Sequence, residues 1–141
     1  MMTIPVWVLL GFAGWTLIVL LGTVGVYRWS RILTGRAAIQ EFRSGVPHER
    51  DWYRRGMRAH ANCVENLPVY GAIVLALVVS KLNSSTLDLL ALTIMASRIV
   101  QTMTHISFEE TSTAVSVRFT FFIFQFVCMF WMGIYVVVNV L

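Results

Sequence analysis

Residues 4–27 read IPVWVLLGFAGWTLIVLLGTVGVY and carry no charged side chain. About 20 apolar residues, each rising roughly 1.5 Å in an α-helix, cross a hydrocarbon core about 30 Å thick. The stretch is therefore long enough to span a bilayer. Positive charge follows it at Arg28, Arg31 and Arg36, whereas a cleaved signal peptide carries its positive charge before the apolar run. We expect a membrane helix that is retained.

The composition of the whole chain favours a membrane protein. Of its 141 residues, 57% are hydrophobic and 13% are charged. These proportions exclude a disordered chain, a disulfide scaffold and an ordinary nucleic-acid-binding domain. Cys63 and Cys128 lie in apolar stretches, where a thiol behaves as a small hydrophobic group. The length predicts one domain, residues 1–141.

Three more spans follow from the same length argument. Residues 119–141 are free of charge. The apolar run 67–80 has only 14 residues, so a spanning helix must extend back through Glu65, Asn62 and Arg58.

The stretch 87–106 spans a bilayer only with Arg98 near its middle. The predicted fold class is an all-α integral membrane protein, a bundle of four transmembrane helices. We expect the helices at about 4–30, 56–82, 87–106 and 115–140.

Basic residues gather in and beside the first loop. Of the 11 Lys and Arg residues, those in this region are Arg28, Arg31, Arg36, Arg43, Arg50, Arg54, Arg55 and Arg58. The positive-inside rule assigns this loop to the cytoplasm, so both termini lie outside. The net charge of +4 then reflects orientation, and we expect no nucleic-acid partner.

Polar residues within the spans form a constellation. Ionisable side chains at membrane depth are costly and are functional candidates by default. In the second span Arg58, Asn62 and Glu65 are spaced i, i+4 and i+7, so they share one helix face. Similar spacing recurs in the third and fourth spans, in Arg98, Gln101, Thr102 and His105 and in Arg118 and Gln125.

Each candidate also has a structural interpretation. Glu65 and Arg98 both lie roughly 12 to 14 Å inside the membrane by helical rise. They can form a structural ion pair, or Glu65 can contact a ligand. Arg58 and Arg118 can extend to the lipid headgroups instead. We interpret His105 and Tyr70 as interfacial or packing residues. The phenylalanine-rich fourth span is interpreted as a packing surface.

Residues 58–68, RAHANCVENLP, resemble the second-helix signature of the membrane-associated proteins in eicosanoid and glutathione metabolism, the MAPEG family. Four helices, a basic first loop, a short second loop and an arginine opening the fourth helix extend the resemblance over essentially the whole chain. It implies a homotrimer that binds glutathione between subunits near the cytosolic side. It further implies glutathione contacts for Arg58, Asn62 and Glu65. The resemblance also likens Arg98 to a third-helix arginine of the family and Arg118 to the fourth-helix arginine that faces the thiol.

The residues themselves suit that ligand. Glutathione carries two carboxylates, an ammonium and a thiol, so its pocket needs arginines, an acceptor such as Glu65 and an amide such as Asn62. A guanidinium in a low-dielectric site favours the thiolate, so Arg118 is the predicted catalytic residue. The thiolate would add to a lipophilic electrophile or reduce a lipid hydroperoxide. We assign no metal ligand.

Departures from the family keep other functions open. Phe119 and Phe122 stand at or near positions where the prostaglandin E synthase branch has a serine and a tyrosine, and Gln101 and His105 replace a histidine and a tyrosine. The chain resembles a divergent, bacterial member of the family, and we expect it in the inner membrane. One alternative is a non-catalytic lipid-binding or accessory subunit, within a larger membrane complex. Another is a small multidrug transporter that uses Glu65 as its carboxylate.

Overall fold

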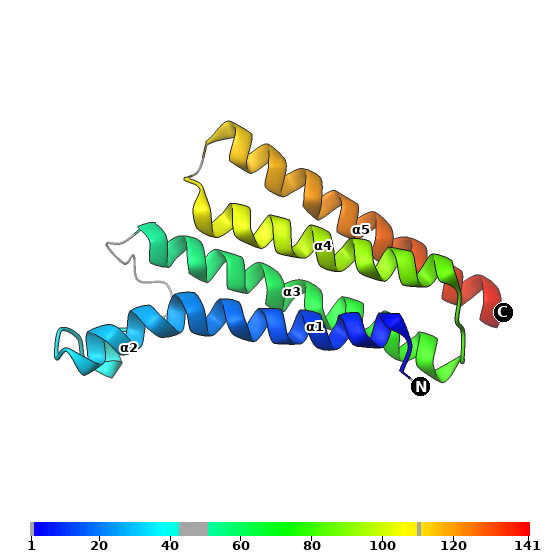
Figure 1. Cartoon of the computed structure of the whole chain (residues 1–141), viewed down its shortest axis with the longest axis horizontal. Coiled ribbons are helices and arrows are strands. Elements are labelled where there is room, and N and C mark those ends of the chain that lie inside the picture. Colours follow the sequence, from blue (N-terminus) through cyan, green and yellow to red (C-terminus); the bar gives the residue numbers. More distant parts are fainter. Residues whose placement is uncertain (1, 43–50, 110) are drawn as a thin grey trace.

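The computed structural model describes residues 2–42, 51–109 and 111–141. Within them, four long helical segments run up and down as one bundle (Figure 1). The first segment is continuous and consists of α1 (Ile4–Val19), a π-helical turn η1 (Leu20–Gly25) and α2 (Val26–Leu33); a short 3-10 turn, η2 (Ile39–Glu41), follows it. The others are α3 (Asp51–Val79), α4 (Ser85–Ser107) and α5 (Ser112–Val140). All four segments are long and apolar enough to cross a membrane, which confirms the predicted fold class.

The two ends of the bundle differ in charge. Both termini and the α3–α4 turn lie at one end, and α2, the start of α3 and the α4–α5 link lie at the other (Figure 1). We call the latter the basic end, because most of the described arginines lie there. Arg43 and Arg50, which the predicted basic loop includes, fall outside the described residues.

The helix ends differ from those expected. α3 begins at Asp51 and ends at Val79, whereas hydropathy predicts about 56–82. Its first turns are too polar for a hydrocarbon core, so a search for apolar spans overlooks them although they are helical. Likewise α2 carries the first helix on to Leu33, past the expected end at about residue 30.

Two helix ends are fixed by residues in the left-handed backbone region. After α2, Gly35 has φ 67°, and its N–H donates to the Ile32 carbonyl at 3.0 Å. After α3, Lys81 has φ 54°. There the Lys81 N–H donates to the Val78 carbonyl and the Leu82 N–H to the Leu77 carbonyl, at 3.2 and 3.1 Å. This is the Schellman arrangement, and it ends α3 before its expected boundary.

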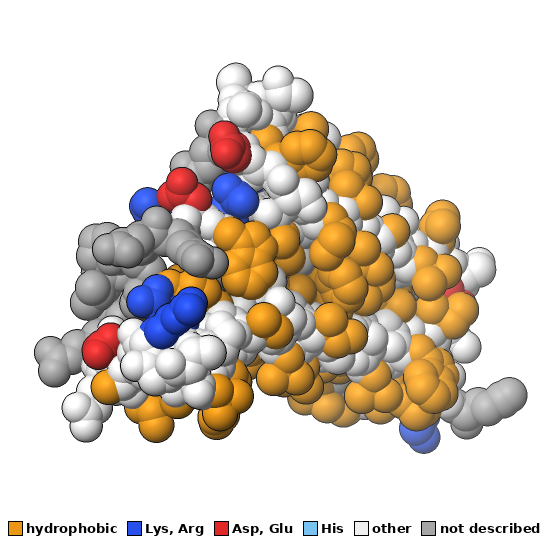
Figure 2. All heavy atoms as spheres, turned by 60° about the vertical axis from the view of Figure 1, so that its left-hand side comes forward, with side chains coloured by type: hydrophobic (Ala, Val, Ile, Leu, Met, Phe, Trp, Pro, Cys, Tyr) orange, Lys and Arg blue, Asp and Glu red, His pale blue; other side chains and the backbone are white. Residues whose placement is uncertain are grey.

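The core is apolar and so is the outside. Phe12, Tyr70, Ile94 and Met132 are fully buried, and the Tyr70 hydroxyl donates to the Pro5 carbonyl at 3.0 Å. Tyr70 therefore packs in the core, as expected. Hydrophobic side chains also cover much of the outer surface, while charged ones gather toward the basic end (Figure 2). A surface of this kind suits lipid rather than water.

The first segment and α3 approach closely near the basic end. A β-carbon placed on Gly56 would lie 2.7 Å from the Thr23 Cβ and 2.9 Å from its hydroxyl oxygen. Only glycine permits this contact. Because Gly56 stands two residues before Arg58, the contact also sets where the polar face of α3 begins.

Candidate functional site

Arg98 lies at the centre of the bundle, fully buried where α1, α3 and α4 meet. Its Nη1 donates to both the side-chain and backbone oxygens of Asn62, the latter at 3.3 Å, and to Gln101 Oε1 at 3.1 Å. Its guanidinium carbon lies 5.0 Å from the centre of the Phe12 ring, a favourable cation–π distance. The helical spacing of Arg98 and Gln101 brings both side chains onto the face of α4 that meets the core.

Part of the Arg98 guanidinium has no partner. Its Nε and Nη2 are buried and find no hydrogen-bond acceptor among the described residues. An arginine carries five N–H donors, and leaving buried donors unsatisfied is costly. The arrangement therefore favours an acceptor, such as an anion or a polar ligand, beside this side chain.

The possible ion pair between Glu65 and Arg98 does not form. Glu65 is exposed on α3, and the ion pair that the structure shows between two described residues joins Arg54 to Asp51 at 3.7 Å. Helix geometry explains the difference: at about 100° per residue, Glu65 is turned roughly 200° from the fully buried Cys63. The two charges are predicted at the same depth in the membrane, but Glu65 lies on the exposed surface of α3 while Arg98 is buried inside the bundle.

Arg118 is linked to Arg98 through an amide. Gln101 accepts from Arg98 and donates through Nε2 to the Arg118 backbone carbonyl at 3.2 Å. The Gln125 Nε2 donates to Gln101 Oε1 at 3.0 Å and to the Phe121 carbonyl at 2.9 Å. Gln101 and Gln125 thus join α4 to α5. Helical spacing in the sequence places each glutamine on the polar face of its own helix. Nothing in the sequence predicts that the two side chains bond to each other.

The Arg118 side chain is itself largely buried. Its Nε donates to the Ala114 carbonyl and its Nη1 to His105 Nδ1, both at 3.2 Å. Because arginine only donates, His105 must be the neutral tautomer with an unprotonated Nδ1. Sequence reasoning interprets His105 as an interfacial or packing group and misses this role. The Arg118 Nη2 is buried and without an acceptor among the described residues.

The predicted site residues fall into two groups. Asn62, Arg98 and Arg118 belong to the buried network, which Gln101 connects. Arg58 and Glu65 are exposed on α3. Arg58 also lines a polar cavity of about 280 Å³ at the basic end. The other described residues that line this cavity are Asp51, Arg54, Arg55 and Glu109. Asn62, half-buried, lies between the two groups.

A second, apolar groove lies along α3 and α5. It has a volume of about 620 Å³ and is formed by α3 and α5. Asn66 lines the groove and donates through Nδ2 to the Asn62 carbonyl at 2.8 Å. Gly133 lines it too, and a β-carbon there would meet no atom within 4 Å. This hydrogen bond within α3 links a residue that lines the groove to Asn62 of the buried network.

Four membrane-spanning helices with a buried network of arginines and amides define a multi-pass integral membrane protein. The sequence profile of the MAPEG family matches residues 5–138, nearly the whole chain, and the chain belongs to that family. No curated protein and no solved structure matches it. Membership supports, in general terms, a glutathione-related transferase, peroxidase or related role in a membrane.

Proposed function

We propose that the chain is a membrane glutathione-dependent transferase or peroxidase that acts on lipophilic electrophiles or lipid hydroperoxides. The observation that carries the proposal is the face of α3 formed by Arg58, Asn62 and Glu65. It lies within a span, it is charged, and Arg58 and Glu65 are exposed in the single protomer. Such residues face the interior of a membrane assembly rather than lipid.

A second copy of the chain would cover this face. A carboxylate exposed to the hydrocarbon core costs several kcal/mol, so Glu65 requires a protein neighbour, a polar ligand or both. We propose a homotrimer, as in the family, with glutathione between its subunits. Size measurement by light scattering in detergent should give three protomers. A monomer as the only species would contradict the trimer.

The donors and acceptors of the chain fit glutathione. Arg58 and Arg98 offer guanidinium groups to its carboxylates, and Glu65 offers an acceptor to its ammonium. Asn62 supplies an amide that can donate and accept. Support comes from the Arg98 Nε and Nη2 and the Arg118 Nη2, three buried nitrogen atoms that lack acceptors among the described residues.

Arg118 is the proposed catalytic residue. Bound glutathione would supply the thiol nucleophile. A guanidinium beside that thiol favours its ionised form, and the low dielectric of the bundle strengthens the effect. His105 and the Ala114 carbonyl hold the Arg118 side chain in place. Phe119 and Phe122 carry no hydroxyl, so stabilisation of the thiolate is assigned to the arginine alone.

Glutathione binding tests the site directly. Calorimetry of the detergent-purified protein should detect binding, and Arg58→Ala and Glu65→Gln should each weaken it more than about tenfold, or roughly 1.4 kcal/mol. Arg36→Ala and Glu41→Gln are matched controls, because both residues are exposed at the basic end and outside the site. Absence of binding by the wild type would contradict the proposal.

Turnover is a separate test. Conjugation and hydroperoxide reduction should be measured over a panel of lipophilic substrates. Arg118→Ala should lower kcat at least about 100-fold, the typical effect of removing one electrostatic group from an active site, while the size of the assembly stays unchanged. Tight glutathione binding by a wild type without turnover would exclude catalysis.

The groove between α3 and α5 favours a second candidate function, a non-catalytic lipid-binding or accessory subunit. Its lining is almost entirely apolar, and its volume of about 620 Å³ falls within the range of small-molecule pockets. Gly133→Leu would place a side chain in the open space of the groove. Loss of a co-purifying lipid or of a larger complex in this variant, without turnover in the wild type, would favour the accessory role.

We also propose an orientation for the molecule. The basic end faces the cytoplasm, because arginines concentrate there and the positive-inside rule depends on such a bias. Both termini then face outward. In a bacterial cell, the corresponding location is the inner membrane.

A further inference from the structure

A cluster of aromatic rings joins the end of the first segment to α3 at the basic end. Tyr27 and Tyr53 stack with ring centres 4.3 Å apart, and Phe42 meets Tyr27 edge-on at 6.4 Å. Tyr27 and Tyr53 are buried. The three rings come from α2, α3 and the residue after η2, which explains why no local sequence pattern predicts the cluster.

Two arginines are held against these rings. The Arg28 Nε donates to the Tyr53 hydroxyl at 2.8 Å, and its guanidinium carbon lies 5.5 Å from the centre of the Phe42 ring. The Arg31 Nη1 donates to the Tyr27 hydroxyl at 2.9 Å. Each guanidinium is therefore fixed by a hydrogen bond and a cation–π contact.

Neither arginine has a carboxylate partner in the described part of the chain. The one ion pair found there joins Arg54 to Asp51. A neutral phenol takes one N–H from each guanidinium and leaves its charge uncompensated. Two ordered guanidinium groups without a carboxylate favour a phosphate ligand, whose oxygens accept paired N–H bonds.

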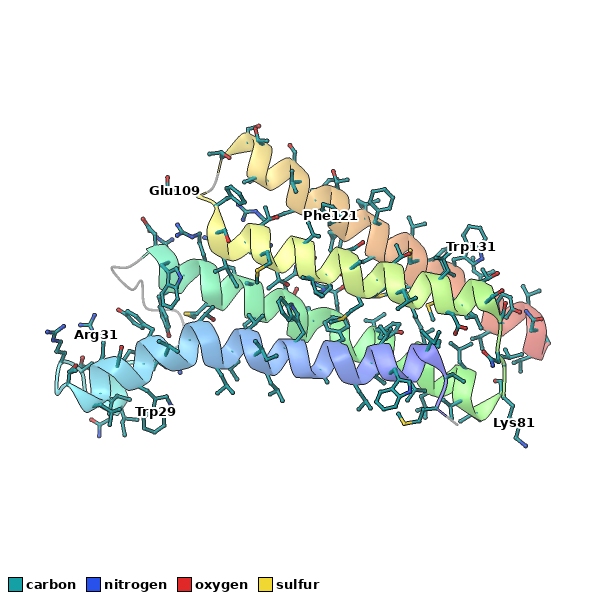
Figure 3. The ribbon with its side chains drawn as sticks, viewed as in Figure 1. Trp29, Arg31, Lys81, Glu109, Phe121 and Trp131 are labelled. Atoms are coloured by element: carbon teal, nitrogen blue, oxygen red, sulfur yellow. The ribbon has the colours of Figure 1, made fainter. Side chains whose placement is uncertain are left out.

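The opposite face of α2 is apolar and exposed. Val26, Trp29 and Leu33 follow helical spacing, and 57%, 61% and 79% of their surfaces are accessible. Figure 3 shows the Trp29 and Arg31 side chains pointing to opposite sides of the helix. Tryptophan beside arginine is typical of the level where hydrocarbon meets headgroups.

The length of the first segment places α2 at that level. From Ile4, about 20 residues cover a hydrocarbon core roughly 30 Å thick. The helix continues to Leu33, so its last two turns, α2, lie at the boundary between the hydrocarbon core and the headgroups. The apolar face of α2 then meets acyl chains while its arginines meet phosphate groups.

We propose that Arg28 and Arg31 form a binding site for the headgroup of an anionic phospholipid, while Trp29 and Leu33, on the opposite face of α2, hold the helix against the acyl chains of the surrounding bilayer. The ring cluster orders the two guanidinium groups before the lipid arrives. Under the orientation proposed above, the lipid belongs to the cytoplasmic leaflet. The site is separate from the polar face of α3 and does not depend on glutathione.

Native mass spectrometry in a neutral detergent tests the site, with dioctanoyl phosphatidylglycerol as the anionic probe and dioctanoyl phosphatidylcholine as the zwitterionic one. The wild type should prefer the anionic lipid. Arg28→Gln combined with Arg31→Gln should weaken its binding about thirtyfold, because each basic residue near an anionic lipid contributes roughly fivefold. Arg36→Gln combined with Lys81→Gln removes the same charge elsewhere and should change binding less than about twofold.

A second pair of variants keeps the charge and removes only the hydroxyls. Tyr27→Phe combined with Tyr53→Phe leaves the rings stacked, so folding is retained, and it should still weaken anionic-lipid binding at least about threefold. Unchanged binding in this variant would show that diffuse charge suffices and would overturn the proposal. Equal binding of both lipids would overturn it too. Displacement of the lipid by equimolar inorganic phosphate would identify a site for free phosphate instead.

Discussion

Arg98 shows how a buried cation is retained without a carboxylate. Asn62, Gln101 and the Phe12 ring surround it, and each offers partial negative charge rather than a full one. These groups compensate the positive charge of Arg98 less than a carboxylate would. They also leave two of its nitrogens without acceptors in the described protomer. The stability of the bundle therefore depends on the few acceptors present.

A single variant and a double variant test this dependence. Asn62→Leu removes the acceptors on the Asn62 side chain and should lower the free energy of unfolding by about 1–3 kcal/mol, the cost of leaving a buried group unsatisfied. Adding Arg98→Met removes the stranded charge and should recover part of that loss. Denaturant unfolding in detergent measures both. Asn139→Leu, at an exposed asparagine of α5, is the control and should change stability by less than about 0.5 kcal/mol.

At the scale of the helix pairs, the contact between Gly56 and Thr23 fixes how α3 packs on the first segment. The Thr23 Cβ is attached to the backbone and cannot turn away, so a β-carbon at position 56 would force the two helices apart. Gly71, also in α3, is different: a β-carbon there would lie 3.7 Å from the Leu9 Cδ1, an ordinary contact. The two glycines therefore form a matched pair.

Alanine at these two positions should have opposite effects. Gly56→Ala should destabilise the protein by about 1–2 kcal/mol, because the steric cost exceeds the gain in helix propensity. Gly71→Ala should stabilise it by up to about 1 kcal/mol. Thermal unfolding in detergent compares the two. A destabilisation of equal size at both positions would contradict a specific contact at Gly56.

The two left-handed helix ends give another pair with opposite signs. Lys81→Gly should raise the free energy of unfolding by about 1 kcal/mol, because glycine adopts the backbone conformation at φ 54° without strain. Gly35→Ala, at φ 67°, should lower it by a similar amount. If glycine at position 81 lowers stability, the Lys81 side chain must make a contact that outweighs its backbone strain.

For the whole molecule, sequence predicts the architecture better than the site. Uninterrupted apolar runs define the four spans, because the bilayer sets a minimum length that few other structures require. The face formed by Arg58, Asn62 and Glu65 also follows from helical spacing. Partners on different helices do not: the bond of Arg98 to Asn62 rather than to Glu65 depends on how α3 is rotated about its axis. Periodicity within one helix does not determine that rotation.

The orientation of the molecule can be tested with introduced cysteines. Both native thiols are buried, so they should react slowly with a membrane-impermeant maleimide applied to intact cells. Asn83→Cys, in the exposed α3–α4 turn, should be labelled from outside. Arg36→Cys, exposed at the basic end, should be labelled only after the membrane is permeabilised. The reverse pattern would contradict a cytoplasmic basic end.

The position of the two termini at one end of the bundle (Figure 1) has a practical consequence. The last residue of one copy can be joined to the first residue of another by a flexible linker that stays on one side of the bilayer and adds no crossing. Three copies could then be encoded as one continuous chain, and a substitution could be introduced into one, two or all three of them. Such a concatemer would reveal how many intact sites each assembly needs, a quantity that mixtures of separate subunits only average.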